Sequence, residues 1–182
     1  EIGSNKMPRA HVRELREAGV EVQVFGATRG WRSRFQINFR NHRKIVIADG
    51  RVALVGGLNV GDEYLDGHPR LGPWRDTHLR VAGPAVDVVQ LAFLEDWFWA
   101  THRIPELSWS GDPELADQQV LVLPTGPADP FDGWLLAVVE AAAAARERLW
   151  IASPYFVPDE AALAALQAAA LRGVDVRILL PD

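Results

Sequence analysis

Hydrophobic positions along this chain of 182 residues repeat with two periods, one near 3.6 residues and one of two residues. The helical period predicts helices at residues 8–18, 84–100, 131–146 and 158–171. Alternation and short apolar runs predict strands at residues 20–24, 35–39, 45–48, 52–55, 76–81, 119–123, 149–153 and 174–180. Strands and helices alternate in the last third of the chain, which favours an α/β fold with a parallel sheet.

The helix predicted at residues 84–100 has a wide apolar arc. Phe93, Trp97, Phe98 and Trp99 lie on this arc with several aliphatic residues. The alternative to a core position is an anchor in lipid, and we expect these aromatic side chains in the core.

Two of the predicted strands form a hairpin. The apolar run at residues 45–48 stops at Asp49 and Gly50, and a second run begins at Val52. An Asp-Gly pair between two such runs is typical of a two-residue hairpin turn.

The residues that flank this hairpin carry candidate chemistry. Side chains alternate between the faces of a strand, so His42 and Lys44 project from one face and Arg43 from the other. Glycines at 56–57 allow a ligand to approach the backbone closely, and Asn59 supplies an amide donor. An imidazole, an ammonium and an amide on one ribbon are suited to hold and attack a phosphate.

The pattern formed by His42, Lys44, Asp49, Gly57 and Asn59 is H-x-K-x4-D followed by G-x-N, which resembles the signature of the phospholipase D superfamily. The resemblance to its bacterial cardiolipin synthase branch extends through five segments. They are N-H-R-K at 41–44, G-G-L-N-V-G-D-E-Y at 56–64, W-R-D-T-H-L-R at 74–80, G-P-A-V at 83–86 and S-P-Y-F-V-P-D-E at 153–160. The resemblance implies a duplicated α-β-α sandwich with a mixed, largely parallel sheet.

The resemblance also implies roles for these residues. His42 would form a phosphohistidine or protonate the leaving group, while Lys44 and Asn59 would hold the phosphoryl oxygens. No metal or other cofactor is required. Asp49 and Gly57 have supporting positions, and Asp49 is expected to bond local backbone in the turn.

A second polar cluster lies on the strand predicted at residues 76–81. Alternation turns Thr77, Leu79 and Val81 to the core and puts Asp76 and His78 on the opposite face, together with Arg80. This face is either a hydrogen-bonded surface ladder or a support for His42.

The charge distribution adds a candidate approach surface. The net charge is −5, which disfavours a surface built wholly for nucleic acid, yet residues 22–48 contain no Asp or Glu. The arginines of this span that precede the motif are Arg29, Arg32, Arg34 and Arg40. They form either a solvated basic loop or a positive lip that leads an anionic lipid to His42, and we favour the lip.

Other classes of protein receive little support. The chain has no cysteine, no close histidine pair, neither of the common glycine-rich nucleotide motifs, and no apolar run of about 18 residues. Zinc or nucleotide chemistry and a membrane span in the visible chain are therefore not expected. The chain begins on Glu1 without a leader, so we expect a piece of a longer protein.

An internal repeat organises the chain. The segments at 15–24 and 169–178 share a helix end, a glycine and an alternating strand, and Gly173 minus Gly19 gives an offset of 154. Chance similarity of two helix–strand junctions is the alternative. If the offset holds, the partner of His42 lies near 42 + 154 = 196, beyond Asp182.

We therefore expect the latter part of a first repeat at residues 1–103, a linker at 104–117 and the beginning of a second repeat at 118–182. The second catalytic motif would come from a further part of the chain or from a second subunit. The chain alone is expected to be inactive.

The predicted function is transfer of a phosphatidyl group between two phosphatidylglycerol molecules, which gives cardiolipin and glycerol, at the bacterial cell membrane with a peripheral catalytic part. The alternatives are a phosphodiesterase that hydrolyses lipid or nucleic acid with water, and a non-catalytic module that binds anionic lipid.

Overall fold

The computed structural model describes residues 7–24, 42–61, 64, 75–109, 118–126 and 129–180. It divides the chain into two compact units, residues 1–124 and 125–182. One sheet has three antiparallel strands, and the other is a parallel pair of strands. The expected α/β class is confirmed, with both antiparallel and parallel pairing present.

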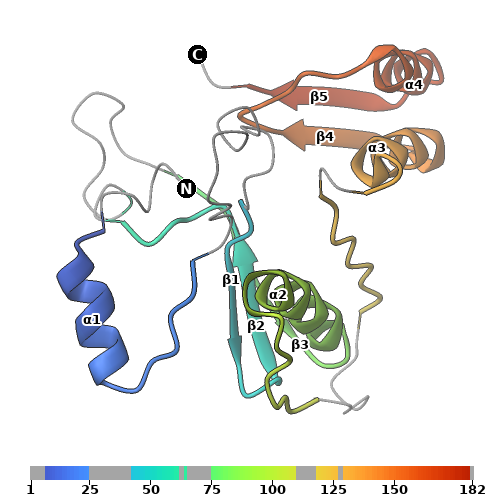
Figure 1. Cartoon of the computed structure of the whole chain (residues 1–182). Coiled ribbons are helices and arrows are strands. Elements are labelled where there is room, and N and C mark those ends of the chain that lie inside the picture. The colour runs from blue at the N-terminus through green and yellow to red at the C-terminus, as the bar shows by residue number, and fades with distance from the viewer. Residues whose placement is uncertain are drawn as a thin grey trace. The chain divides into compact units, whose positions relative to one another are not determined.

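The first unit contains α1 (Arg9–Glu17), β1 (Ile45–Ala48), β2 (Val52–Gly56), β3 (His78–Ala82) and α2 (Ala85–Thr101). Strand β2 is central and pairs antiparallel with β1 and with β3 (Figure 1). The ladder brings residues far apart in the sequence into one row, such as Ile47, Ala53 and Val81.

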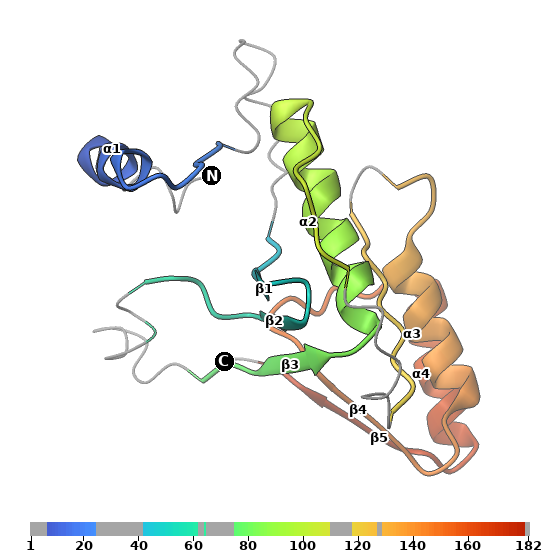
Figure 2. The same cartoon turned by 90° about the horizontal axis from the view of Figure 1, so that it is seen from below.

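Helix α2 covers one face of this sheet (Figures 1 and 2). Ala53, Val86 and Val89 are the buried centre of the contact. Ile45, Ile47, Val55, Val81 and Val122 pack around them. The other face carries Val46 and Leu54, which are 61% and 40% exposed. The two-residue period therefore separates a face toward α2 from an open face.

The hairpin between β1 and β2 confirms the predicted strands and corrects the length of their turn. Ala48 pairs with Val52, so the connection has three residues rather than two. The Arg51 N–H donates to the Ala48 carbonyl at 2.9 Å, and Asp49 and Gly50 have φ of 55° and 66°. Positive φ at both central residues is the geometry that favours Asp-Gly. Arg51 belongs to the loop because this turn ends on its N–H.

Two predicted strands are absent from the described residues, at 20–24 and 119–123. The alternation indicates one polar side and one apolar side of the segment, whereas a strand also needs a backbone hydrogen-bonding partner. The carbonyl of Val22 accepts a hydrogen bond from Arg16 Nη2 at 2.8 Å instead. The strand predicted at 35–39 lies outside the described residues.

The aromatic residues of α2 were expected in the core, and this expectation is wrong for three of them. Phe93, Phe98 and Trp99 are 40%, 48% and 66% exposed. The buried residues of the helix are Val86, Val89, Gln90 and Ala92. Small and medium side chains face the sheet because the helix lies close to it.

The second unit contains α3 (Gly133–Ala144), β4 (Arg148–Ala152), α4 (Glu160–Leu171) and β5 (Asp175–Leu179). Both helices begin at an aspartate whose side chain accepts a hydrogen bond: Asp132 from the Leu135 N–H and Asp159 from the Ala162 N–H. The core is formed by Ala142, Leu166, Ala169 and Val174. The helices lie along the same side of the parallel pair (Figure 1).

Helices α1 and α4 end in the same way. The Val20 N–H donates to the Leu15 carbonyl at 2.9 Å, and the Val174 N–H donates to the Ala169 carbonyl at 3.2 Å. In each case the preceding glycine has a positive φ, 88° at Gly19 and 89° at Gly173. This is the Schellman end, which satisfies free carbonyls of the last turn. Corresponding atoms are 154 positions apart in both pairs, since 169 − 15 = 174 − 20 = 154. The internal repeat and the predicted repeat and linker boundaries stay predictions.

Within the described part of the chain, no helix is long and apolar enough to cross a membrane.

Candidate functional site

Some of the predicted site residues lie near the end of the antiparallel sheet where β1 begins and β2 ends. The Gly56 N–H donates to the Lys44 carbonyl at 3.4 Å, which continues the β1–β2 pairing by one position. Ile45 packs toward α2, so its neighbour Lys44 lies on the open face. His42 is two positions earlier, before the strand begins. The Lys44 Nζ donates to the His42 carbonyl at 2.7 Å, so the ammonium is folded back along the strand.

Arg43 takes the opposite direction, as the alternation predicts. Its Nη1 donates to Asp96 Oδ1 of α2 at 2.7 Å, and the two side chains are 27% and 20% exposed. Sequence reasoning missed Asp96, because nothing in the pattern of α2 indicates a partner 53 positions earlier.

His78 joins the site from β3. It pairs with Gly56 in the β2–β3 ladder. A Cβ on Gly56 would lie 2.5 Å from both Cγ and Nδ1 of His78 and 2.5 Å from the Thr77 carbonyl oxygen. The imidazole therefore occupies the space beside Gly56 that a side chain would take. Lys44, Gly56 and His78 form a cross-strand row, and residues in such a row share a face.

Asp76 is placed in the same way against the next residue. A Cβ on Gly57 would meet the Asp76 carboxylate. One carboxylate oxygen, Oδ1, accepts a hydrogen bond from the Thr77 N–H at 2.7 Å. The glycine pair is needed here because the carboxylate and the imidazole fill the positions of the two missing side chains.

Asn59 follows the end of β2. Its Nδ2 donates to Tyr64 Oη at 2.5 Å, and both side chains are accessible to solvent. Tyr64 is a second residue that sequence reasoning missed. The only signal for it was its place in the G-G-L-N-V-G-D-E-Y segment.

The other predicted positions are separate from this cluster. Asp49 lies at the tip of the hairpin, beyond the whole length of β1 from His42, where its φ of 55° forms the turn. Arg29, Arg32, Arg34 and Arg40 lie outside the described residues. Across the described ranges, no group of three or more His, Asp or Glu side chains is arranged to hold a metal.

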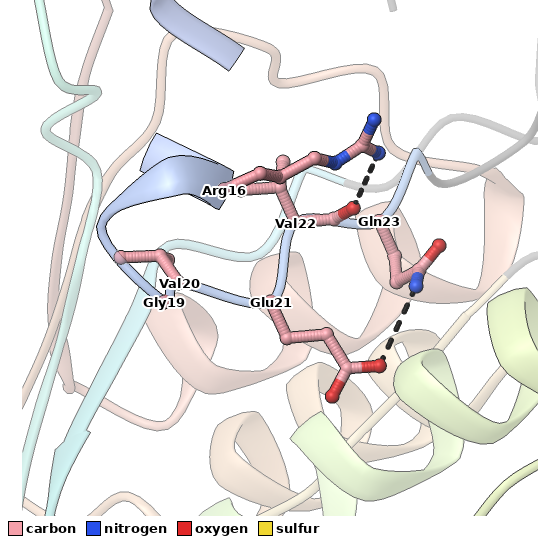
Figure 3. Close-up of a pocket in the computed structure, with 6 residues that line it drawn as sticks. All are labelled: Arg16, Gly19, Val20, Glu21, Val22 and Gln23. Carbon is pink, nitrogen blue, oxygen red and sulfur yellow. Dashed lines mark hydrogen bonds between the residues drawn. The ribbon is translucent and has the colours of Figure 1, made fainter. Parts of the chain in front are cut away.

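A shallow pocket lies elsewhere in the first unit, at the end of α1 (Figure 3). Its lining residues are Arg16, Gly19, Val20, Glu21, Val22 and Gln23. Arg16 bonds the Val22 carbonyl, and Gln23 Nε2 donates to Glu21 Oε1 at 3.5 Å (Figure 3). Its polar groups are occupied by one another, and none of the predicted site residues lines it.

The cluster has the parts needed for attack on a phosphodiester. His42 is an exposed imidazole, a group that can act as a nucleophile, and Lys44 is a cation two positions later. An ammonium has three N–H donors and an amide nitrogen two, so Lys44 and Asn59 each keep a donor for an anionic oxygen beyond the contacts described.

Comparison with known proteins gives the cluster a context. The family model described as "Cardiolipin synthase, PLD-like domain" matches residues 138–182. The chain is 54% identical over 185 residues to Cardiolipin synthase A of Pseudomonas fluorescens (strain SBW25). It is 51% identical over 183 residues to Cardiolipin synthase A of Pseudomonas putida. Each similarity covers 100% of this chain and 38% of the relative, so the chain spans well under half of the length of these curated relatives.

Proposed function

Because the chain belongs to the phospholipase D superfamily, in the branch of the bacterial cardiolipin synthases, we propose that it supplies one half of a phosphatidyl-transfer site. The reaction joins two phosphatidylglycerol molecules into cardiolipin and releases glycerol. The observation that supports the proposal is the position of His42 and Lys44 just before β1, next to the end of β2 that leads to Asn59.

The first step is attack by an imidazole nitrogen of His42 on the phosphorus of one phosphatidylglycerol. A P–N bond forms, the P–O bond to the glycerol headgroup breaks, and the leaving alkoxide takes a proton from a general acid. In the second step, a hydroxyl of another phosphatidylglycerol attacks the phosphohistidine and gives up its proton. The P–N bond breaks and the imidazole is regenerated.

Lys44 and Asn59 stabilise the charge that develops on the non-bridging oxygens. The Lys44 ammonium already reaches back to His42 through the carbonyl, which keeps the cation beside the nucleophile. His78 supports the site from β3 and Asp76 from just before it, where the carboxylate fills the space beside Gly57, while Asp49 forms the distant hairpin turn.

The general acid is assigned to a second histidine outside this chain. The equal helix ends 154 positions apart and the 38% coverage of the relatives support a second motif near position 196 of a longer chain. A second subunit is the other source of this motif.

The substrate is an anionic phospholipid at a membrane surface, so the catalytic part acts at the bacterial cell membrane as a peripheral body. The acid-free span at residues 22–48, with Arg29, Arg32, Arg34 and Arg40, is proposed to attract the anionic surface.

The test uses a protein extended to the length of the relatives. His42→Ala is expected to abolish transfer of labelled phosphatidyl groups between phosphatidylglycerol molecules, and Asn59→Ala to lower turnover on the order of 10²-fold. His11→Ala is the matched control, because it removes an exposed imidazole from α1, away from the cluster. Full transfer by the His42→Ala protein contradicts the proposal, and hydrolysis without transfer in the unaltered protein favours the phosphodiesterase alternative.

A further inference from the structure

A charged pair connects the start of β1 with helix α2. Arg43 Nη1 lies 2.7 Å from Asp96 Oδ1. Among the ion pairs between described residues this is the shortest and the least exposed, with side chains 27% and 20% accessible. In contrast, the Arg103–Glu21 pair of the same unit is 3.3 Å long and 74% and 49% exposed. A shielded pair with this short contact holds its geometry better than a solvated one.

The position of Arg43 in the sequence gives the pair a consequence for the site. Arg43 stands between His42 and Lys44, and successive side chains of an extended chain point to opposite faces. When the guanidinium is held on the α2 side, the imidazole and the ammonium are directed to the open side. A change in the direction of Arg43 would therefore redirect both neighbours.

The strand ladder alone does not fix this direction firmly. Regular β1–β2 pairing begins at Ile45, and residues 42–44 precede it. The hydrogen bond from Gly56 to the Lys44 carbonyl is long, at 3.4 Å. The short contact from Lys44 to the His42 carbonyl lies within the segment and cannot orient it relative to the sheet. The Arg43–Asp96 pair ties this segment to helix α2.

Asp96 is itself on a rigid support. Val89, Ala92 and Asp96 follow the helical spacing of three and four residues, and the first two are 4% exposed in the contact with the sheet. The carboxylate therefore projects from the packed side of α2, where helix and sheet are fixed together.

We propose that Asp96 is a positioning residue for His42: by holding Arg43 against α2, it keeps the imidazole and the Lys44 ammonium on the open face in register for attack. This inference rests on the proposed role of His42. Asp96 does not contact the substrate and acts through Arg43.

The experiment compares Asp96→Asn with Glu95→Gln. Both convert a carboxylate of α2 to an amide, but Glu95 is exposed and adjacent to Asp96, so it controls for charge and for helix stability. The first measurement is the NMR signal of the His42 side chain in the 182-residue chain, assigned with His42→Ala. We expect Asp96→Asn to shift and broaden this signal, whereas Glu95→Gln leaves it unchanged.

The second measurement is transfer kinetics in the protein extended to the length of the relatives. Asp96→Asn is expected to lower kcat by about 10- to 100-fold with little change in KM, because small displacements of a reacting group have effects of this size. The reversed pair Arg43→Asp with Asp96→Arg is expected to recover most of the rate and the His42 signal. A purely structural role would change protein yield and stability without this recovery.

The outcomes separate the two proposals. If His42→Ala abolishes transfer while Asp96→Asn behaves like Glu95→Gln in both measurements, the positioning role is wrong and the proposed function stands. If His42→Ala retains transfer, the proposed function is wrong. If Asp96→Asn does not fold, the reversed pair decides: a folded reversed pair with the unaltered His42 signal supports the positioning role, and one with a shifted, broadened signal overturns it.

Discussion

Gly56 pairs with His78 across the β2–β3 ladder, and the imidazole of His78 fills the space in which a side chain of residue 56 would lie. This relationship joins the third strand to the candidate site. It explains in physical terms why glycines stand at positions 56 and 57, next to His78 and Asp76.

A methyl group at position 56 should therefore disturb the site. In Gly56→Ala, the new Cβ would lie 2.5 Å from the His78 ring and from the Thr77 carbonyl oxygen, so β3 must shift. We expect a loss of about 1 to 3 kcal/mol in the free energy of unfolding of the first unit, as for other overpacked positions. Urea unfolding in the presence and absence of His78→Ala measures the effect. The loss should be smaller when His78 is already alanine, and an equal loss in both backgrounds would show that the ring does not cause it.

Much of this arrangement could be predicted from the sequence, because it depends on local rules. The Asp49–Gly50 pair predicted the hairpin, and Arg43 lies on the α2 side of the sheet. The glycine after each of two helices gave the helix ends at Gly19 and Gly173.

The parts that could not be predicted depend on contacts between distant residues. The Arg43–Asp96 pair joins positions 53 apart, and no periodicity reports it. The apolar alternation at residues 20–24 suggested a strand, but a strand also requires a partner, and the Val22 carbonyl bonds Arg16 instead. The fit of His78 beside Gly56 depends on a register that the sequence alone does not state.

The basic span gives a prediction about membranes. Binding of the chain to vesicles should rise with the fraction of phosphatidylglycerol and fall as salt is added, because exposed charges are screened. Replacing Arg29, Arg32 and Arg34 together with glutamine should remove most of this dependence. Replacing Arg9, Arg13 and Arg103 removes the same charge elsewhere and is the control. Vesicle co-sedimentation measures the binding of both variants. Binding that does not change with salt or with lipid charge would show that the span is a solvated loop.

The side chain of Arg172 caps the C-terminal end of helix α3 in the second unit. Its Nη2 donates to the carbonyls of Ala142 and Ala143 in the last turn of α3, at 2.6 Å and 3.3 Å. Arg172→Ala should weaken this end by about 1 kcal/mol, since free carbonyls and the helix dipole lose a cation. Hydrogen exchange of the amides in the last turn of α3 should speed up about fivefold, while those of α2 stay unchanged. Equal exchange in both proteins would mean that water replaces the guanidinium without loss.

Asp175 gives a prediction about acid. The hydrogen bond from Arg177 Nε, at 3.0 Å, lowers the pKa of Asp175 from its ordinary value of 3.8 despite some desolvation. The hydrogen bond from Trp150 Nε1, at 3.2 Å, lowers the pKa further. A carboxyl group with a depressed pKa in the folded state adds stability above its unfolded pKa, and this stability is lost as pH falls through the folded pKa.

Arg177→Gln should therefore raise the pKa of Asp175 toward 3.8. The variant should then lose less stability than the unaltered protein as the pH falls. Arg148→Gln should have a smaller effect, because Arg148 acts on Asp175 only through its charge. NMR titration of the Asp175 carboxyl carbon measures both. A larger change in the pKa of Asp175 from Arg148→Gln than from Arg177→Gln would contradict this order of causes.

The central claim is that His42 is the nucleophile of a phosphatidyl transfer, and the most direct measurement is to trap the intermediate. The protein extended to the length of the relatives is mixed with phosphatidylglycerol, quenched in alkali within the first turnover, digested and analysed by mass spectrometry, with His42→Ala in parallel. Alkali is used because a phosphorus–nitrogen bond on imidazole survives it better than it survives acid. We expect a phosphatidyl adduct, or the glycerophosphoryl adduct that remains after alkali cleaves the acyl esters, on the peptide that contains His42, absent from the His42→Ala protein. An adduct found only on another histidine, with His42 unmodified and transfer intact, would contradict it.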